Sequence, residues 1–197
     1  MKISLDKIAY HLSSSKTKPN KMMREEVLPF LLENNVQKIL DYGCGKFLRD
    51  SLLLTENGFE VDAVDMEEQI EIIDKEKAKR MHGLSTKIKD NNYDAALLNF
   101  VLQVLPTEKQ RKETLKNVYN AIRKGGYLIF SLRNTWDIKK YAEPSGIPFK
   151  DGFVMEKTNT FVRGYTKKEL TEILRSLNMD IIRIHSSSVS YVSISKK

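Results

Sequence analysis

The sequence predicts an α/β domain with a doubly wound, mostly parallel sheet that closes in an antiparallel hairpin. Strand-like and helix-like segments alternate as far as Leu132, which is typical of parallel sheets built from βαβ units. Residues Lys38–Lys46, reading KILDYGCGK, look like a buried strand that enters a glycine turn and then a helix. After Leu132 one further helix pattern precedes two closing strands, and such an antiparallel edge is permitted on a mostly parallel sheet.

Length and composition favour one globular domain. The chain has 197 residues, of which 41% are hydrophobic and 30% charged, enough for one substantial core. No apolar run approaches the ~20 residues needed to cross a bilayer, and the first residues, MKISLDKIAYHLSSS, lack the apolar core of a secretory signal. We therefore expect a cytoplasmic protein without a membrane contact.

The N-terminal segment is the most basic part of the chain. The net charge is +7, and through Arg24 six basic residues stand against Asp6 alone. Because SSSKTKPN combines serines, lysines and a proline, we expect residues 1–18 to form a flexible lead or a lid and residues 19–197 to form a single domain. The basic segment can contact nucleic-acid phosphates; a solvated tail is the alternative.

The first half of the chain supplies three helix patterns and four strand patterns in order. Residues 20–33 place apolar side chains on one helical face, and Pro29 is expected to kink or shorten that helix. The helix after the glycine turn is expected to stop at Gly58, and FEVDAVD then reads as a second strand. MEEQIEIIDKEKAKR predicts a helix, STKIKD a third strand, and YDAALLNFVLQVLP opens with a central strand covered on both faces.

The second half is marked by two capping boxes, Thr107 with Gln110 and Thr166 with Glu169, each of which predicts a helix start. We expect RKGG to end the first of these helices and YLIFSL to form the next strand. Residues 134–163 are the least regular, and we expect a loop over the carboxyl edge of the sheet. The end, DIIRIHSSSVSYVSIS, reads as two strands joined by a serine-rich turn.

An acid and two glycines form the candidate binding turn. Gly43 and Gly45 follow Asp41 at the end of the first strand, and glycines let a backbone approach a ligand closely at a helix N-terminus. Asp65 lies twenty residues after Gly45, at the end of the second strand. A carboxylate there can accept hydrogen bonds from a ribose diol.

The motifs LDYGCG, VDAVD, YDAALLNFVLQVLP and IRKGGYLIFSL resemble, in order and spacing, those of the class I S-adenosylmethionine-dependent methyltransferases. The resemblance covers about residues 20–195, and it implies a Rossmann-like sheet and S-adenosyl-L-methionine as cofactor. Phe47 stands where that family usually has a third glycine. A dinucleotide-binding fingerprint would instead require glycine at the position of Leu48.

The resemblance also implies roles for the residues of the turn. Gly43 and Gly45 would line the methionine part of the cofactor, and Asp65 would bind the ribose hydroxyls. Cys44, between the two glycines, is a further candidate for cofactor binding. Asp41 would orient the turn or reach the amino group of the cofactor through water. The alternatives are glycines that serve only chain reversal, Asp65 as a helix N-cap and Asp41 as a cap of its own turn.

Three further residues are candidates for the site. Asn99 and Phe100 end the central strand, where ligands of parallel sheets bind, and they can contact cofactor or acceptor. His11 is a candidate general base if the N-terminal lead folds over the site; a surface histidine without a role is the alternative. His82 and His185 show no metal-ligand spacing, and we expect no metal.

The expected activity is methyl transfer to an unidentified acceptor, which is a small molecule or a modified nucleic-acid or peptide group. NFVL lacks the two prolines that DNA amino-methyltransferases carry at this place, which argues against base amines as acceptors. TKPNKMMREEV, LNFVLQVLP and TNTFVRGYTKKEL resemble methyltransferases found beside DNA-phosphorothioation and phage-defence systems. The alternatives are a nucleotide-binding oxidoreductase and a noncatalytic S-adenosylmethionine-binding module that contacts nucleic acid.

Overall fold

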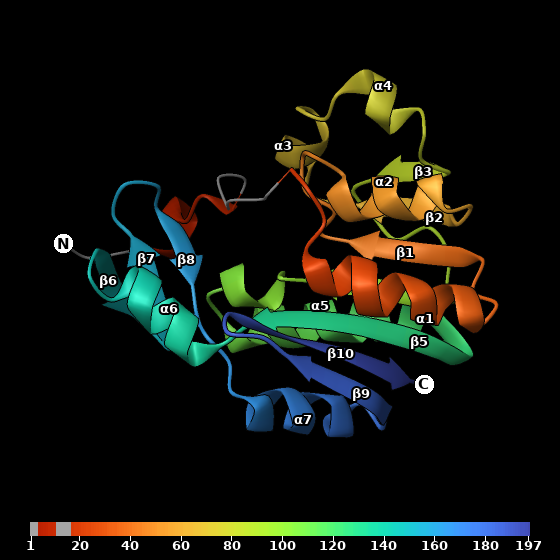
Figure 1. Ribbon diagram of the computed structural model, residues 1–197. Helices are drawn as coiled ribbons and strands as arrows, with labels where there is room; N and C mark the ends of the chain where they lie inside the picture. Colours follow the sequence, from red (N-terminus) through yellow and green to blue (C-terminus); the bar gives the residue numbers. More distant parts are fainter. Residues whose placement is uncertain (1–3, 11–16) are drawn as a thin grey trace.

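A seven-stranded sheet in the order β3-β2-β1-β4-β5-β10-β9 forms the centre of the computed structural model (Figure 1), which describes residues 4–10 and 17–197. The neighbours from β3 to β5 pair in parallel, and β10 and β9 pair antiparallel. The predicted doubly wound sheet with its closing hairpin is therefore confirmed. Its strands are β1 (Lys38–Tyr42), β2 (Glu60–Val64), β3 (Gly83–Ser85), β4 (Tyr93–Asn99), β5 (Ile122–Arg133), β9 (Asp180–Ser186) and β10 (Ser190–Lys196).

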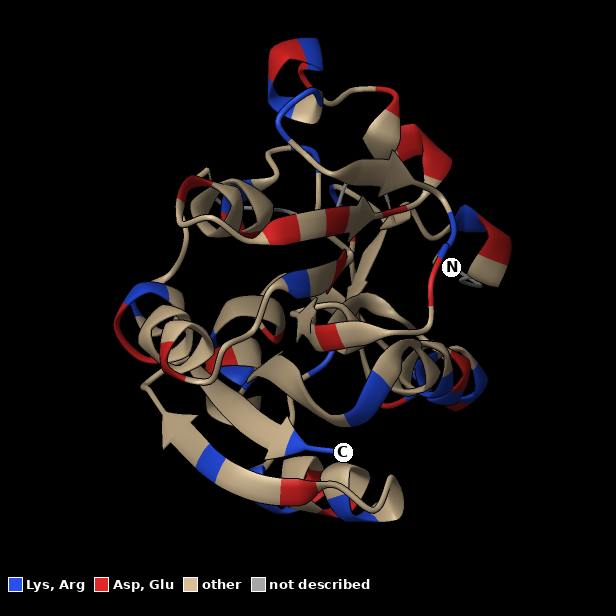
Figure 2. Ribbon diagram, turned by 90° about the vertical axis from the view of Figure 1, so that its right-hand side faces the viewer, with Lys and Arg blue, Asp and Glu red and all other residues tan. Residues whose placement is uncertain are grey.

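Helices cover both faces of this sheet. The α-helices are α1 (Leu28–Glu33), α2 (Arg49–Glu56), α3 (Glu67–Ile70), α4 (Lys75–Ala78), α5 (Glu108–Ala121), α6 (Thr135–Ala142) and α7 (Lys167–Ser176), and the other helical turns are η1 (Leu5–Lys7), η3 (Met23–Val27) and η4 (Leu102–Val104). η3, α1 and α2 pack on one face of the sheet, and α5 and α7 pack on the other. Seen after a quarter turn, both acidic and basic residues lie on the outer helices, and the strands are mostly uncharged (Figure 2).

The central strand explains why both faces need cover. In β4, Leu97 belongs to the apolar cluster under α1 and α2, and Leu98 belongs to the cluster under α5 and α7. Successive strand side chains point to opposite faces. Both leucines are completely buried, as the continuous apolar run predicts.

Pro29 lies inside a continuous helical segment, and it does not break it. The π-helical turn η3 directly precedes α1, and Pro29 occupies the first turn of α1. A proline ring conflicts with the carbonyl four residues earlier, and a widened turn avoids that conflict. The predicted irregularity at Pro29 takes the form of a π-turn directly before α1. Met23, Val27 and Leu31 are buried on one face of the segment.

Three predicted boundaries were wrong. The helix expected over MEEQIEIIDKEKAKR divides into α3 and α4, because Asp74 accepts the amide of Lys77 and starts a new helix. The third strand lies at Gly83–Ser85 rather than at STKIKD, since it pairs only with the end of β2. RKGG does not end α5 but belongs to β5, where Gly125 and Gly126 exchange hydrogen bonds with Lys197.

The segment 134–163 is not the irregular loop that we expected. It folds into α6 and a second, antiparallel sheet of β6 (Gly146–Phe149), β7 (Gly152–Met155) and β8 (Thr160–Val162). We call α6 and this sheet the cap. It lies beyond the carboxyl ends of the parallel strands (Figure 1), and Ile8 of the N-terminal segment packs against its residues Val154 and Phe161.

None of the helices in residues 4–10 and 17–197 is long and apolar enough to cross a membrane.

Candidate functional site

The glycine turn between β1 and α2 depends on backbone conformations that glycine adopts without strain. Gly43 has φ +77° and Gly45 has φ +67°. The Gly43 amide donates to the Val64 carbonyl at 2.7 Å, which ties the turn to the end of β2. A Cβ on Gly43 would lie 2.3 Å from Cγ2 of Val101, so only glycine fits between β1 and the segment that follows β4.

Asp65, which follows β2, is hydrogen-bonded to the glycine turn that follows β1. Its Oδ2 accepts the Gly45 amide at 2.7 Å and its Oδ1 accepts the Met66 amide at 2.8 Å. Burial raises the pKa of Asp65, and these two hydrogen bonds act against that rise. Each carboxylate oxygen has a second lone pair, so Asp65 can still accept two hydroxyl groups.

Asp41 is directed into the protein rather than toward solvent. It is 2% exposed, and its Oδ2 accepts the Ser51 hydroxyl at 2.5 Å. Burial raises the pKa of Asp41 to about 7, the charge of Asp50 acts in the same direction, and the Ser51 hydrogen bond opposes both. Asp41 therefore connects the first turn of α2 to the end of β1.

A buried polar chain connects the ends of β5, β4 and α2. Ser131 donates to Oδ1 of Asn99 at 2.6 Å, and Nδ2 of Asn99 donates to Oδ2 of Asp50 at 3.1 Å. Asp50 also pairs with Arg49, whose Nε lies 3.3 Å from Oδ1. Asn99 is thus at the carboxyl edge as predicted, but its oxygen and its nitrogen both bind protein groups.

Two residues with side chains adopt the left-handed backbone conformation beside the turn. Leu48 has φ +49° directly before α2, and Phe100 has φ +63° directly after β4. The guanidinium of Arg49 lies 5.7 Å from the centre of the Phe100 ring. Such strained positions cost about 1–3 kcal/mol each and cluster at functional sites, so the carboxyl edge carries more strain than a plain turn requires.

The remaining predicted residues differ in how the structure places them. Cys44 is buried, and its burial raises the pKa of the thiol, which leaves it unreactive. His11 lies outside the described residues, and so do residues 1–3 and 12–16 of the predicted lead. His82 binds Asp62, and His185 lies 3.3 Å from Glu26.

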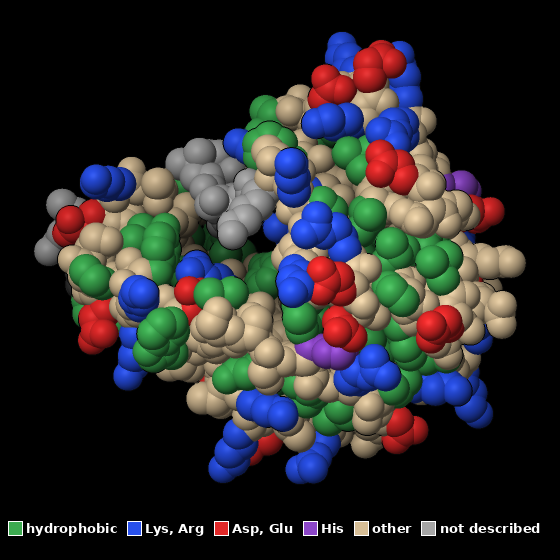
Figure 3. Space-filling view, viewed as in Figure 1, with side chains coloured by type: hydrophobic (Ala, Val, Ile, Leu, Met, Phe, Trp, Pro, Cys, Tyr) green, Lys and Arg blue, Asp and Glu red, His purple; other side chains and the backbone are tan. Residues whose placement is uncertain are grey.

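The carboxyl edge faces a hollow. Figure 3 shows this hollow between the cap and the body of the protein. Asp65, Phe100 and the glycine turn all lie at the ends of strands that run toward the cap. Ligands of open parallel sheets bind at such an edge.

Sequence reasoning missed Arg49, Asp50, Ser131 and Val101. Ser131 is a polar residue inside the apolar run YLIFSL, and this break in the apolar pattern indicates a residue with a polar partner. In the structure Ser131 pairs in register with Asn99. The dipeptide Arg49–Asp50 gave no comparable signal. Its importance depends on the position of β4, which lies about fifty residues later in the chain.

Comparisons with known proteins identify the family and the fold. The sequence profile of a family described as "Methyltransferase domain" matches residues 17–184. No curated protein matches the sequence. A solved S-adenosylmethionine-dependent methyltransferase from Methanosarcina mazei has 22% identity and a TM-score of 0.65, over 85% of this chain and 96% of that chain.

Two further solved structures share the fold. The 1,6-didemethyltoxoflavin-N1-methyltransferase of Burkholderia thailandensis, solved with bound 1,6-didemethyltoxoflavin and S-adenosylhomocysteine, has 18% identity and a TM-score of 0.65, over 90% of this chain and 78% of that chain. An S-adenosylmethionine-dependent methyltransferase from Clostridium acetobutylicum has 14% identity and a TM-score of 0.67, over 90% of this chain and 92% of that chain. At these identities the likeness shows the fold.

Proposed function

The chain belongs to the methyltransferase domain family, and we propose that it is a cytoplasmic enzyme that transfers the methyl group of S-adenosyl-L-methionine to a small molecule or to a modified nucleic-acid or peptide group. One observation carries this proposal most directly. Asp65, at the end of β2, holds the glycine turn at the end of β1 and keeps acceptor capacity for two hydroxyls. That combination suits a nucleoside with a free ribose diol.

The residues present fit such a cofactor. Gly43 and Gly45 let main chain approach it closely, and Asp65 would accept its ribose hydroxyls. Arg49, a largely buried guanidinium beside the turn, would pair with its carboxylate, because guanidinium binds carboxylate through paired donors. Asp41 would act through Ser51 by holding the start of α2 in place.

The chemistry of the reaction places modest demands on the protein. The sulfonium of the cofactor activates the methyl group, so the chain need not supply a nucleophile. Its residues contribute by orienting the reactants and excluding water, which can lower the barrier by several kcal/mol. The cap and the carboxyl edge, which bound the hollow between them, are placed to do both.

Replacing Asp65 tests the cofactor site. We expect Asp65→Ala to weaken S-adenosylhomocysteine binding at least tenfold, about 1.4 kcal/mol, in isothermal titration calorimetry. Asp62→Ala is the matched control: this carboxylate lies three residues earlier, within β2, and binds His82 and Tyr93 instead of the turn. Equal affinities for wild type and Asp65→Ala, or binding of NAD in preference to S-adenosylhomocysteine, would contradict the proposal.

The basic N-terminal segment remains a separate prediction. Nucleic acid as a partner or acceptor is supported here only by charge, and Lys21 already pairs with Glu25. Binding through phosphates would weaken steeply with added salt. Titration of the protein with DNA and RNA at two salt concentrations tests it.

A further inference from the structure

The cap is attached to the body at its root by two chain segments that run side by side. The Tyr165 amide donates to the Arg133 carbonyl at 3.0 Å, and the Thr135 amide donates to the Tyr165 carbonyl at 3.1 Å. Gly164 lies so close to this crossing that a Cβ would stand 2.4 Å from Cα of Thr135. The root is therefore a compact pair of backbone segments through which the chain enters and leaves the cap.

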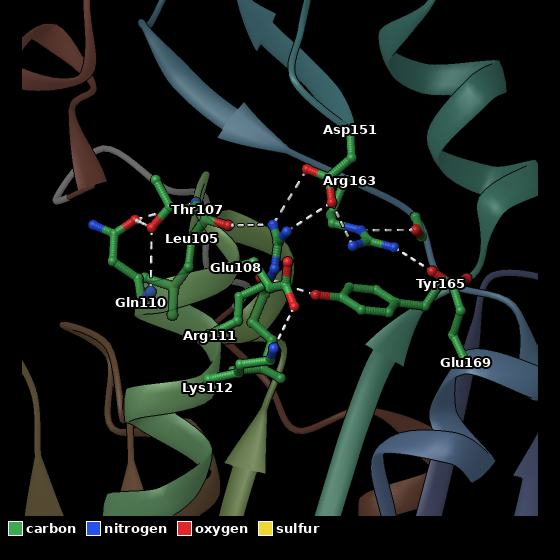
Figure 4. Close-up of polar contacts among 12 residues, drawn as sticks. Leu105, Thr107, Glu108, Gln110, Arg111, Lys112, Asp151, Arg163, Tyr165 and Glu169 are labelled. Carbon is green, nitrogen blue, oxygen red and sulfur yellow. Dashed lines mark hydrogen bonds and ion pairs between the residues drawn. The ribbon is translucent and has the colours of Figure 1, made fainter. Parts of the chain in front are cut away.

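Beside this root, charges also tie the cap to the body. The turn between β6 and β7 carries Asp151, whose Oδ2 lies 2.6 Å from Nη2 of Arg111 and 2.6 Å from Nη1 of Arg163 (Figure 4). Arg111 belongs to the first turn of α5 in the body, and Arg163 follows β8. One carboxylate thus bridges two guanidinium groups that are far apart in the sequence.

Burial makes this bridge consequential. The side chains of Arg111 and Arg163 are only 9% and 13% exposed, and that of Asp151 is 41% exposed. If the carboxylate of Asp151 is lost, the two guanidinium groups that share its oxygen repel each other. A buried charge without its partner also lowers the stability of the folded protein. Arg163 also pairs with Glu169, and Nη1 of Arg111 also donates to the Leu105 carbonyl at 2.8 Å.

One short segment of the chain contacts both this charge bridge and the glycine turn. Residues 100–107 connect β4 to α5. Near one end, Val101 packs on Gly43, and at the other end Arg111 binds the carbonyl of Leu105. Between them the Tyr165 hydroxyl donates to the Leu102 carbonyl at 3.3 Å, and the Arg163 amide donates to the Gln103 carbonyl at 2.9 Å. Loss of the bridge would loosen a segment that contacts the turn directly.

We propose that Asp151, Arg111 and Arg163 are positioning residues for methyl transfer. They form an ionic catch that ties the β6–β7 turn of the cap to α5 of the body, beside the root at residues 133–135 and 163–165, and so holds the cap over the carboxyl edge. This inference rests on the proposed function for the role of the hollow. The catch itself follows from the contacts of the free protein.

Hydrogen exchange of the full chain, measured by mass spectrometry, tests the catch. We expect Asp151→Asn to exchange at least about fivefold faster than wild type over residues 146–155, with β1, β4 and β5 unchanged. Asp90→Asn is the matched control, because Asp90 pairs with Lys38 and its side chain is similarly exposed, at 36%. Asp151→Glu keeps the carboxylate and is expected to restore much of the protection.

The positioning role needs a second readout, the dissociation rate of S-adenosylhomocysteine. We expect Asp151→Asn to release it at least about threefold faster and Asp90→Asn to match wild type. Unchanged exchange over 146–155 would refute the catch. Faster exchange with unchanged release would refute the positioning role. A wild type that does not bind S-adenosylhomocysteine would refute the proposed function and the positioning role together, and exchange would still decide whether the catch exists.

Discussion

The glycine turn and the cap bound the same hollow, yet different forces fix them. Positive φ angles and main-chain hydrogen bonds to β2 determine the turn. At its β6–β7 turn, the cap is held by side-chain charges that come from three separate stretches of the chain. Backbone geometry is encoded locally, whereas a charge bridge depends on the completed fold. The turn is therefore expected to be insensitive to added salt, whereas the charge bridge of the cap is expected to weaken as salt is added.

The largest effect expected at the glycine turn is the pH dependence of stability that Asp41 causes. Its pKa is raised to about 7 from 3.8, so the native state binds more protons than the unfolded state between these values. Stability from this group is complete below about pH 4 and is lost as pH rises through 7. Asp41→Asn should remove this loss, which amounts to up to about 4 kcal/mol between pH 4 and 8.

Denaturant unfolding at several pH values gives the measurement. The difference in unfolding free energy between wild type and Asp41→Asn cancels the titration of other groups. Ser51→Ala removes a hydrogen bond that lowers the pKa of Asp41, and we expect it to move the pH window upward. Parallel profiles for wild type and Asp41→Asn would show that Asp41 is ionised in the folded protein throughout this range.

Gly43→Ala is the next largest test. We expect it to destabilise the protein by about 3 kcal/mol, through a strained φ and the overlap with Val101, and to weaken S-adenosylhomocysteine binding more than tenfold. Gly58→Ala is matched to it, because Gly58 has φ +88° but nothing within 4 Å of an added Cβ. It should cost only about 1 kcal/mol. Calorimetry and denaturant unfolding give both numbers.

A second substitution, at Val101, tests the cause of the Gly43→Ala effect. If the overlap with Val101 is the main cause, Val101→Ala should recover part of the stability that Gly43→Ala loses. Equal costs for Gly43→Ala and Gly58→Ala would instead mean that the segment after β4 moves aside without strain. The turn would then be less rigid than its backbone angles indicate.

The parts of the fold that sequence reasoning predicted are those governed by local rules. Both capping boxes are present at Thr107 and Thr166, and Gly58 follows α2 with a positive φ. The apolar run of β4 is buried as expected. Each of these depends on neighbours within a few residues, or on a hydrophobic pattern that one element carries alone.

The parts that were missed depend on partners far away in the chain. RKGG has the composition of a helix end, but its amide and carbonyl groups pair with Lys197, the last residue. The cap was read as a loop because its strands have three or four residues each and carry few pattern repeats. Asn99 was placed at the edge correctly, but its binding to Asp50 and Ser131 needed the positions of three elements.

Substitutions in the two capping boxes are expected to have the smallest effect on stability, and they test whether loosening of α5 in the body spreads to the cap. Thr107→Ala and Thr166→Ala should each cost about 1 kcal/mol in unfolding free energy. Gln110 of the first box also donates to the Tyr10 hydroxyl at 3.0 Å, and the nearby Ala9 amide donates to Asn159 in the cap at 3.0 Å.

Thr107→Ala should therefore speed hydrogen exchange at Ala9, and Thr166→Ala, whose partner Glu169 remains bound to Arg163, should leave Ala9 unchanged. Amide exchange followed by NMR resolves this single residue. Equal acceleration in both variants would mean that Ala9 responds to global stability. Acceleration in Thr107→Ala alone would show that the first turn of α5 transmits local loosening to the edge of the cap, since it carries both Arg111 and Gln110.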